Sequence, residues 1–181
     1  MVVFFLLCSV SVLAFAGADR EGLASKQFLN AAFNGKPPPP KMLLLSDKDK
    51  QALEGIFKHA LAFKRVRYWQ RGEQTVWLLN EVGKHKRITA GFWLLGRNIK
   101  QAKVLAFRES RGWEIKYSYF LKQYKGLSLR ADNMLDQSVD GISGATLSVR
   151  AMSKMARMAL YLNQKISQAD YGLESTEGLL K

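Results

Sequence analysis

The chain has 181 residues, which is enough for one domain with a substantial hydrophobic core. It carries 28 Lys and Arg against 15 Asp and Glu, a formal net charge of +13. Its one cysteine, Cys8, lies in an apolar leader, and its two histidines, His59 and His85, are isolated in the sequence. We therefore expect no iron–sulfur cluster, no thiolate zinc site and no histidine-based metal or catalytic site.

The basic residues are spread along the chain, and no nucleic-acid-binding signature accompanies them. We therefore expect no nucleic-acid partner. An excess of positive charge attracts anionic surfaces, so the charge indicates either an anionic membrane surface or an acidic protein partner. The third interpretation is a basic face that is merely solvated.

Residues 1–16 are predicted to be a signal peptide, because they are apolar and end in Ala14-Phe15-Ala16, an Ala-x-Ala cleavage pattern. No Lys or Arg precedes the apolar run, so either the true start lies upstream or export is weak. A membrane anchor is the alternative, but it needs about 20 apolar residues, more than this run supplies. We expect a periplasmic or otherwise extracytoplasmic protein, with membrane association as an option.

Residues 17–45 are predicted to form an N-terminal helix, over about 19–35, followed by a proline-rich connector at 37–40. The main domain is predicted over 46–168. It begins with a helix, because Ser46-Asp47-Lys48-Asp49 combines an N-cap with an acidic first turn and apolar residues follow at helical spacing.

Four segments with strand character follow, at 65–69, 75–82, 88–95 and 99–107, and turn sequences separate them. The order predicts an antiparallel meander. A last helix, over about 147–166, is predicted to pack one face against the sheet as core residues: Met152, Met155, Ala156, Ala159, Leu162 and Ile166. The predicted fold class is α+β, an antiparallel sheet of about four or more strands packed by helices, and residues 169–181 are predicted to be a loosely ordered tail.

The segment directly before the last helix reads Asp140-Gly141-Ile142-Ser143-Gly144-Ala145-Thr146. Small residues let the backbone approach a ligand closely, and a helix N-terminus offers unpaired N–H groups to an anion. A hydroxyl at this position can contact a phosphate or be esterified by one. The alternative is that these are ordinary capping residues.

This motif, continued by Leu147-Ser148, resembles the attachment motif of the FMN-binding domain family. The family includes domains in the C subunit of the sodium-pumping NADH:quinone oxidoreductase and in the G subunit of the Rnf complex. Residues 104–115 resemble the family's strand and flavin loop, and residues 120–126 resemble its aromatic-Gln-aromatic-x-Gly element. The resemblance covers roughly 74–162 and is closest to a small stand-alone exported bacterial member.

The resemblance implies that a dedicated flavin transferase esterifies FMN through its phosphate to Thr146. It makes Asp140 the acidic residue of the motif and Ser148 its trailing hydroxyl, and it places the loop at 109–112 against the flavin. Arg150 would pair with the phosphate or face solvent, and Trp113 would stack on the flavin or be buried as a structural residue. The predicted cofactor-binding residues are Thr146, Asp140, Ser143, Gly144, Ala145, Leu147, Ser148, Arg150, Glu109, Ser110, Arg111 and Gly112.

The predicted function is that of an extracytoplasmic electron-transfer flavoprotein with covalent FMN, rather than a stand-alone enzyme with catalytic residues of its own. No Gly-x-Gly-x-x-Gly follows a strand, so a nicotinamide site is not expected. The partners of this flavoprotein would be membrane or extracytoplasmic redox proteins. Two alternatives stay open: a complete reductase acting on a small acceptor, and an exported basic module that docks an anionic partner or membrane surface without redox activity.

Overall fold

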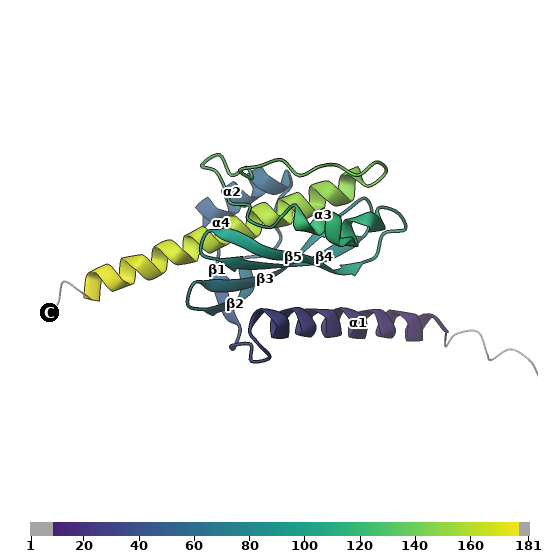
Figure 1. The fold of residues 1–181 in the computed structure, drawn as a ribbon, viewed down its shortest axis with the longest axis horizontal. Helices are drawn as coiled ribbons and strands as arrows, with labels where there is room; N and C mark the ends of the chain where they lie inside the picture. Colours follow the sequence, from purple (N-terminus) through teal and green to yellow (C-terminus); the bar gives the residue numbers. More distant parts are fainter. Residues whose placement is uncertain (1–8, 178–181) are drawn as a thin grey trace, which may run out of the picture.

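The computed structural model describes the backbone of residues 9–177 and the side chains of residues 19–168. The elements are, in chain order, α1 (Ser9–Ala32), β1 (Lys41–Leu44), α2 (Asp47–Phe57), β2 (Arg65–Arg71), β3 (Gln74–Val82), β4 (Arg87–Leu95), β5 (Asn98–Phe107), the 3-10 helix η1 (Trp113–Lys116), α3 (Ser118–Lys122) and α4 (Thr146–Glu177). Figure 1 shows the sheet between the two long helices, with α4 on one side and α1 on the other.

The sheet is a five-stranded antiparallel meander with the order β1-β2-β3-β4-β5. The longest unbroken pairing joins β3 to β4, from Gln74↔Leu95 to Val82↔Arg87. The predicted α+β class and all four predicted strands are confirmed. The strand β1 was not predicted, because Lys41-Met42-Leu43-Leu44 has no period-2 alternation, and only its pairing with β2 makes it a strand.

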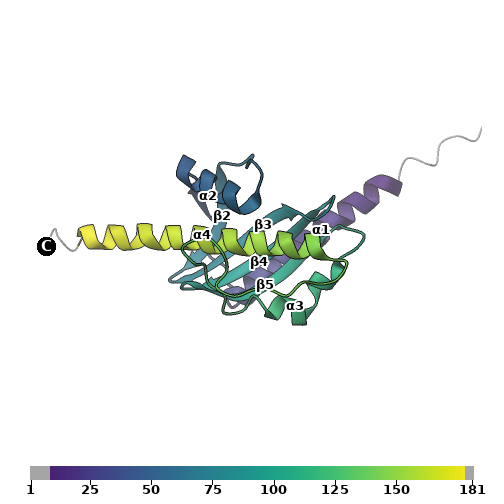
Figure 2. The ribbon, with the colours of Figure 1, turned by 90° about the horizontal axis from the view of Figure 1, so that it is seen from above.

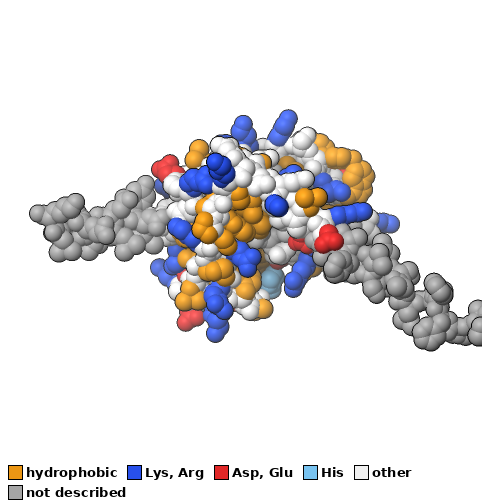
Figure 3. Space-filling model, turned by 90° about the horizontal axis from the view of Figure 1, so that it is seen from below, with side chains coloured by type: hydrophobic (Ala, Val, Ile, Leu, Met, Phe, Trp, Pro, Cys, Tyr) orange, Lys and Arg blue, Asp and Glu red, His pale blue; other side chains and the backbone are white. Residues whose placement is uncertain are grey.

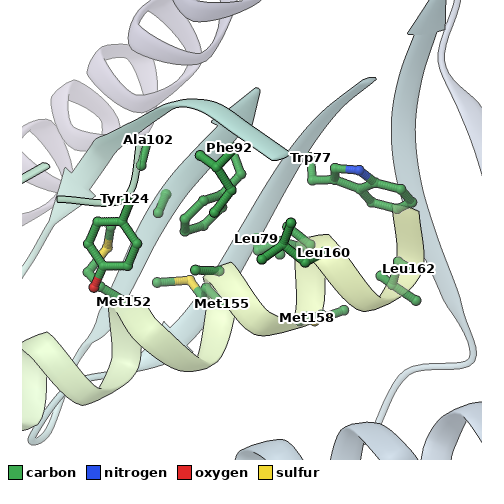
Figure 4. Packing of buried hydrophobic residues seen from close by; sticks show 14 of the residues in the cluster. Trp77, Leu79, Phe92, Ala102, Tyr124, Met152, Met155, Met158, Leu160 and Leu162 are labelled. Carbon is green, nitrogen blue, oxygen red and sulfur yellow. The ribbon is translucent and has the colours of Figure 1, made fainter. Parts of the chain in front are cut away.

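The larger part of the core lies between the sheet and α4. Figure 4 shows Met152 and Met155 of α4 on the side of the helix that faces Phe92, and Leu160 and Leu162 nearer to Trp77, while Met158 lies on another side of the helix. Met152 and Met155 are 0% exposed, so their predicted role as core residues is confirmed, and Met158, at 2% exposed, is a further buried methionine that was not predicted. The face of α4 that points away from this core is left to carry polar residues.

The opposite face of the sheet is covered by α1, as the view from above also shows (Figure 2). The contact is close at one point, because a Cβ on Gly91 of β4 would lie 2.6 Å from the Phe28 ring of α1. Arg108 forms an ion pair with Glu21 of α1, and Thr89 Oγ1 donates to the same carboxylate at 2.6 Å. These contacts hold α1 to the end of β5 from which the flavin loop leaves.

The two long helices differ in extent from their predictions. The helix α1 begins at Ser9 rather than near residue 19, and α4 continues to Glu177, through the segment that was predicted to be loosely ordered. A helix extends at little further cost once it is nucleated, and Ala169, Leu173 and Glu174 in this segment favour it. Residues 1–8 of the predicted signal peptide lie outside the described residues. Among the described helices, none is both long and apolar enough to cross a membrane.

Candidate functional site: the first turn of α4 and the flavin loop

Thr146 is the first residue of α4, and its side chain is exposed. The turn before it depends on Gly144, whose φ of 78° lies in the left-handed region. Ala145 N–H donates to the Ile142 carbonyl at 3.0 Å, and Val149 N–H donates to the Ala145 carbonyl at 3.0 Å. The helix therefore begins at Thr146 with a well-defined orientation.

The first turn of α4 leaves its backbone donors free. In the part of the chain that the structure describes, the N–H groups of Thr146, Leu147 and Ser148 have no hydrogen-bond acceptor. Nothing lies within 4 Å of the position that a Cβ on Gly144 would take, so there is open space beside them. Free N–H groups, the positive end of a long helix and an exposed hydroxyl together suit a phosphate.

The loop predicted to contact the flavin (residues 109–112, the flavin loop) comes shortly after β5 and packs against this first turn. Gly112 has a φ of 84°, and a Cβ there would lie 2.9 Å from Ser148 Oγ and 3.3 Å from Ala145 Cβ. Ser148 is only 4% exposed as a result. The structure thus brings together Gly112, Ala145 and Ser148, which were predicted as parts of one site from segments far apart in the sequence.

Glu109 of the flavin loop makes its contacts with the β3–β4 turn. Its Oε1 accepts hydrogen bonds from the backbone N–H groups of Lys84, His85 and Lys86, at 2.6, 2.6 and 2.8 Å. The bond from Lys86 contributes most to lowering the pKa of Glu109 below its ordinary value. These bonds orient the flavin loop through the neighbouring turn, and a direct contact of Glu109 with a cofactor stays a prediction.

The other predicted residues lie in the flavin loop, in the segment before α4 and in its first two turns. Most of them are exposed: Ser110, Arg111, Asp140, Ser143, Gly144, Leu147 and Arg150. Arg150 lies four residues after Thr146 and so lies one turn along the same side of α4. It is the cation of α4 closest in sequence to the exposed hydroxyl.

Gln123 is a residue of the site that the sequence analysis quoted but did not include in the predicted set. Its Oε1 accepts a hydrogen bond from the backbone N–H of Asp140 at 2.7 Å, which holds the start of the motif. The next residue, Tyr124, is buried and its hydroxyl lies 3.1 Å from Ser153 Oγ on α4, and this burial raises the pKa of Tyr124. The available signal was the resemblance of residues 120–126 to the family's aromatic-Gln-aromatic-x-Gly element.

Exposed aromatic side chains continue the site beyond the flavin loop. Trp113 is 47% exposed, so the alternative of a buried structural Trp is wrong. Its ring packs edge-on against Tyr117 at 5.2 Å between centroids, and Tyr117 lies 5.6 Å from Tyr119. Exposed rings of this kind offer faces on which a planar heterocycle can stack.

Glu114 adds an acceptor that no sequence pattern indicated. Its Oε2 is buried and has no hydrogen-bond partner among the described residues. Buried polar atoms are normally paired, so this oxygen is available to a donor such as a polyol hydroxyl. It follows Trp113 directly in η1.

The fold and the geometry together define an α+β domain with a helix start whose first N–H groups have no acceptor in the described chain, together with a buried acceptor and exposed aromatic rings in η1 and α3. This arrangement fits a molecule with a phosphate at one end and a planar ring system at the other. The fit rests on the free first-turn donors and on the unpaired Glu114 oxygen.

One segment of the chain is similar to a known family of domains. Residues 83–161 match the model of the FMN-binding domain family, which confirms the resemblance read from the motif and supports FMN as the cofactor. The fold is similar to that of the crystal structure of Shewanella oneidensis NqrC, with a TM-score of 0.57 over 82% of this chain and 99% of that chain. The two are 13% identical in sequence, so this similarity concerns the fold. No curated protein matched the chain.

Proposed function

We propose that the chain is an electron-transfer flavoprotein that holds FMN through a phosphoester bond to Thr146. The single observation that carries the proposal is the first turn of α4, where an exposed threonine hydroxyl stands beside three N–H groups without acceptors in the described chain. Bound FMN supplies the electron chemistry, while the protein supplies placement and charge.

Attachment would require only the Thr146 hydroxyl from this chain. Its Oγ would bond to the FMN phosphorus of FAD, AMP would leave, and the hydroxyl proton would pass to a base of the transferase or to water. The resulting diester carries one negative charge at the start of α4, a position that favours an anion by about 0.3–1 kcal/mol. Arg150, one turn further along, would add a second favourable charge.

Each remaining part of the site has a role in placing the cofactor. Gly112 lets the flavin loop reach the first turn of α4, and Gln123 holds Asp140 at the entrance of the motif. The exposed face of Trp113 would border the ring system, and Glu114 would accept a hydrogen bond from the ribityl chain. Arg111 near the ring would favour its anionic reduced form.

We further propose an extracytoplasmic location, a flavin transferase as maturation partner, and membrane or extracytoplasmic redox proteins as donor and acceptor. The apolar leader ending in Ala-x-Ala supports export, and a covalent bond prevents loss of the cofactor by dilution. Figure 3, which looks at the side on which α1 lies, shows Lys and Arg side chains spread among hydrophobic ones and few acidic ones. Such a surface suits an acidic redox partner or an anionic membrane.

The decisive experiment is intact mass spectrometry of the chain produced together with a flavin transferase. We expect a mass gain equal to FMN minus one water and a yellow oxidised spectrum. Thr146→Ala should lose both, while the matched variant Thr146→Ser should keep both because it retains the hydroxyl. An unmodified mass in exported, folded wild-type protein would contradict the proposal and favour the basic binding module without redox activity.

A further inference from the structure

A cavity of about 380 Å³ opens between β2 and β3, away from the first turn of α4. The two strands pair only from Tyr68↔Trp77 to Arg71↔Gln74. Beyond this point β3 continues to Val82, while β2 follows β1 instead. The strands therefore separate, and the segment after α2 borders the gap between them.

The inner wall of the cavity is apolar. It is lined by Phe57, Val66, Leu79 and Met158, each at most 6% exposed. Phe63 and Val82 also line it and are 37% and 47% exposed, so apolar surface continues to the mouth. A cavity of this size and lining takes a small molecule with an apolar body.

The mouth of the cavity is cationic. Arg65, Arg67 and Arg87 line it, and within the described part of the chain their side chains have no ion pair and no hydrogen bond. Three arginines with free guanidinium groups around one opening suit a carboxylate or similar anion, because each guanidinium can donate two parallel hydrogen bonds.

The one carboxylate in the lining does not cancel this charge. Glu81 is 7% exposed, and its Oε1 lies 3.3 Å from Lys154 Nζ and 3.3 Å from His59 Nε2. The nearby Lys154 offsets the charge of Glu81, so the three arginines determine the sign of the potential at the mouth.

We propose that this cavity binds an amphipathic organic anion, with its apolar body on the inner wall and its anionic group among Arg65, Arg67 and Arg87. The inner wall of the cavity is remote from the proposed attachment point, since Met158 lies about 18 Å from Thr146 along α4 at 1.5 Å per residue. At the mouth, Val82 and Arg87 flank the β3–β4 turn that Glu109 contacts. The inference goes beyond the proposed function and does not depend on it.

The test is isothermal titration of the full chain, with and without FMN, using decanoate below its micelle-forming concentration. We expect one decanoate per chain in both forms. Decanol, which lacks the charge, and acetate, which lacks the apolar body, should each bind at least about tenfold more weakly. Equal binding of decanol or acetate would overturn the proposal, as would the absence of decanoate binding. These binding outcomes do not test the attachment of FMN, which is measured separately by the intact mass of the chain.

Variants of the lining residues test whether decanoate binds in this cavity. Arg65→Gln combined with Arg67→Gln should weaken decanoate binding at least about tenfold. The matched control is Arg97→Gln, since Arg97 is also exposed but lies in the turn at the opposite end of β4 from Arg87. Ala62→Trp, at an exposed position of the lining, should obstruct the cavity and weaken binding without removing a charge. Circular dichroism should show all three variants folded, and unchanged decanoate affinity in the double arginine variant would overturn the proposal.

Discussion

The N-termini of α2 and α4 start from similar residues and use them in opposite ways. At α2, Ser46 Oγ accepts from Asp49 N–H at 3.2 Å, and Asp49 Oδ2 accepts from Ser46 N–H at 2.8 Å, so the hydroxyl and the carboxylate close the helix end. At α4, Thr146 and the two residues after it present N–H groups that have no acceptor in the described chain.

The start of α2 is buried against another helix, whereas the start of α4 is exposed. Asp49 is 1% exposed and also accepts hydrogen bonds from Tyr161 and Lys165 of α4, at 3.1 and 2.8 Å. The α2 cap is therefore part of the packing between two helices. The start of α4 is exposed, with small residues before it. The partners of the first-turn donors thus distinguish a structural helix start from one that can receive an anionic ligand.

The largest expected effect concerns Thr146 and sharpens this comparison. Thr146→Ala should abolish covalent flavin completely, while the free energy of unfolding of the flavin-free protein changes by less than about 0.5 kcal/mol, because the hydroxyl makes no structural bond. Flavin absorbance per chain and urea unfolding measure the two quantities. A stability loss above about 1 kcal/mol would instead make Thr146 a structural cap like Ser46.

The next largest effect is expected at the buried α2 cap. Asp49→Ala should lower the free energy of unfolding by about 3 kcal/mol, because it leaves Lys165, Tyr161 and the α2 start without their shared acceptor. Urea unfolding measures this loss. Flavin content per folded chain should not change, and a loss of flavin would contradict the separation of the two helix starts.

The pH dependence of stability should follow from the same carboxylate. Burial raises the pKa of Asp49, but hydrogen bonds from Lys165, Ser46 and Tyr161 outweigh burial and hold the pKa below its ordinary value of 3.8. The stability from this group is therefore present above pH 3.8 and lost as the pH falls through the lower folded value. Acid unfolding curves should show this loss in the wild type and a smaller one in Asp49→Asn.

A smaller effect is expected where the flavin loop contacts α4. Gly112→Ala should cost about 1–3 kcal/mol of stability and reduce flavin incorporation, since the new Cβ meets Ser148 Oγ in addition to the left-handed φ. The matched control is Gly126→Ala, with a φ of 88° and nothing within 4 Å of its Cβ position. Equal losses of stability and flavin in both variants would show that the contact with Ser148 has no role.

The smallest effect is expected for the hydroxyl of the α2 cap. Ser46→Ala should cost about 1 kcal/mol of unfolding free energy, as removal of an N-cap side chain does. Ser143→Ala, at an exposed serine before α4, is the control and should change stability by less than about 0.5 kcal/mol. Thermal unfolding of the two variants compares them directly, and a larger loss for Ser143→Ala would contradict the open character of the α4 start.

Much of the chain could be predicted from local sequence. Alternation at residues 65–69 and strand-like segments between turn sequences located β2, β3, β4 and β5. Helical spacing located the face of α4 that carries Met152 and Met155, and the residues from Asp140 to Thr146 marked the helix start that the structure leaves open. The matched segment 83–161 confirms the family resemblance drawn from that motif. These features succeed because periodicity, capping residues and positive-φ glycines act over a few neighbouring residues.

Other features were decided only by tertiary structure. The contact of Gly112 with Ser148, the bonds of Glu109 to the β3–β4 turn, and the bond of Gln123 to Asp140 each join segments separated along the chain. The cavity exists because β2 leaves β3 to follow β1, a strand with no alternation of its own. Sequence by itself determined which residues could start α4 and carry a phosphate. The fold decided which partners reach them, because long-range contacts depend on how the whole sheet pairs and not on any local pattern.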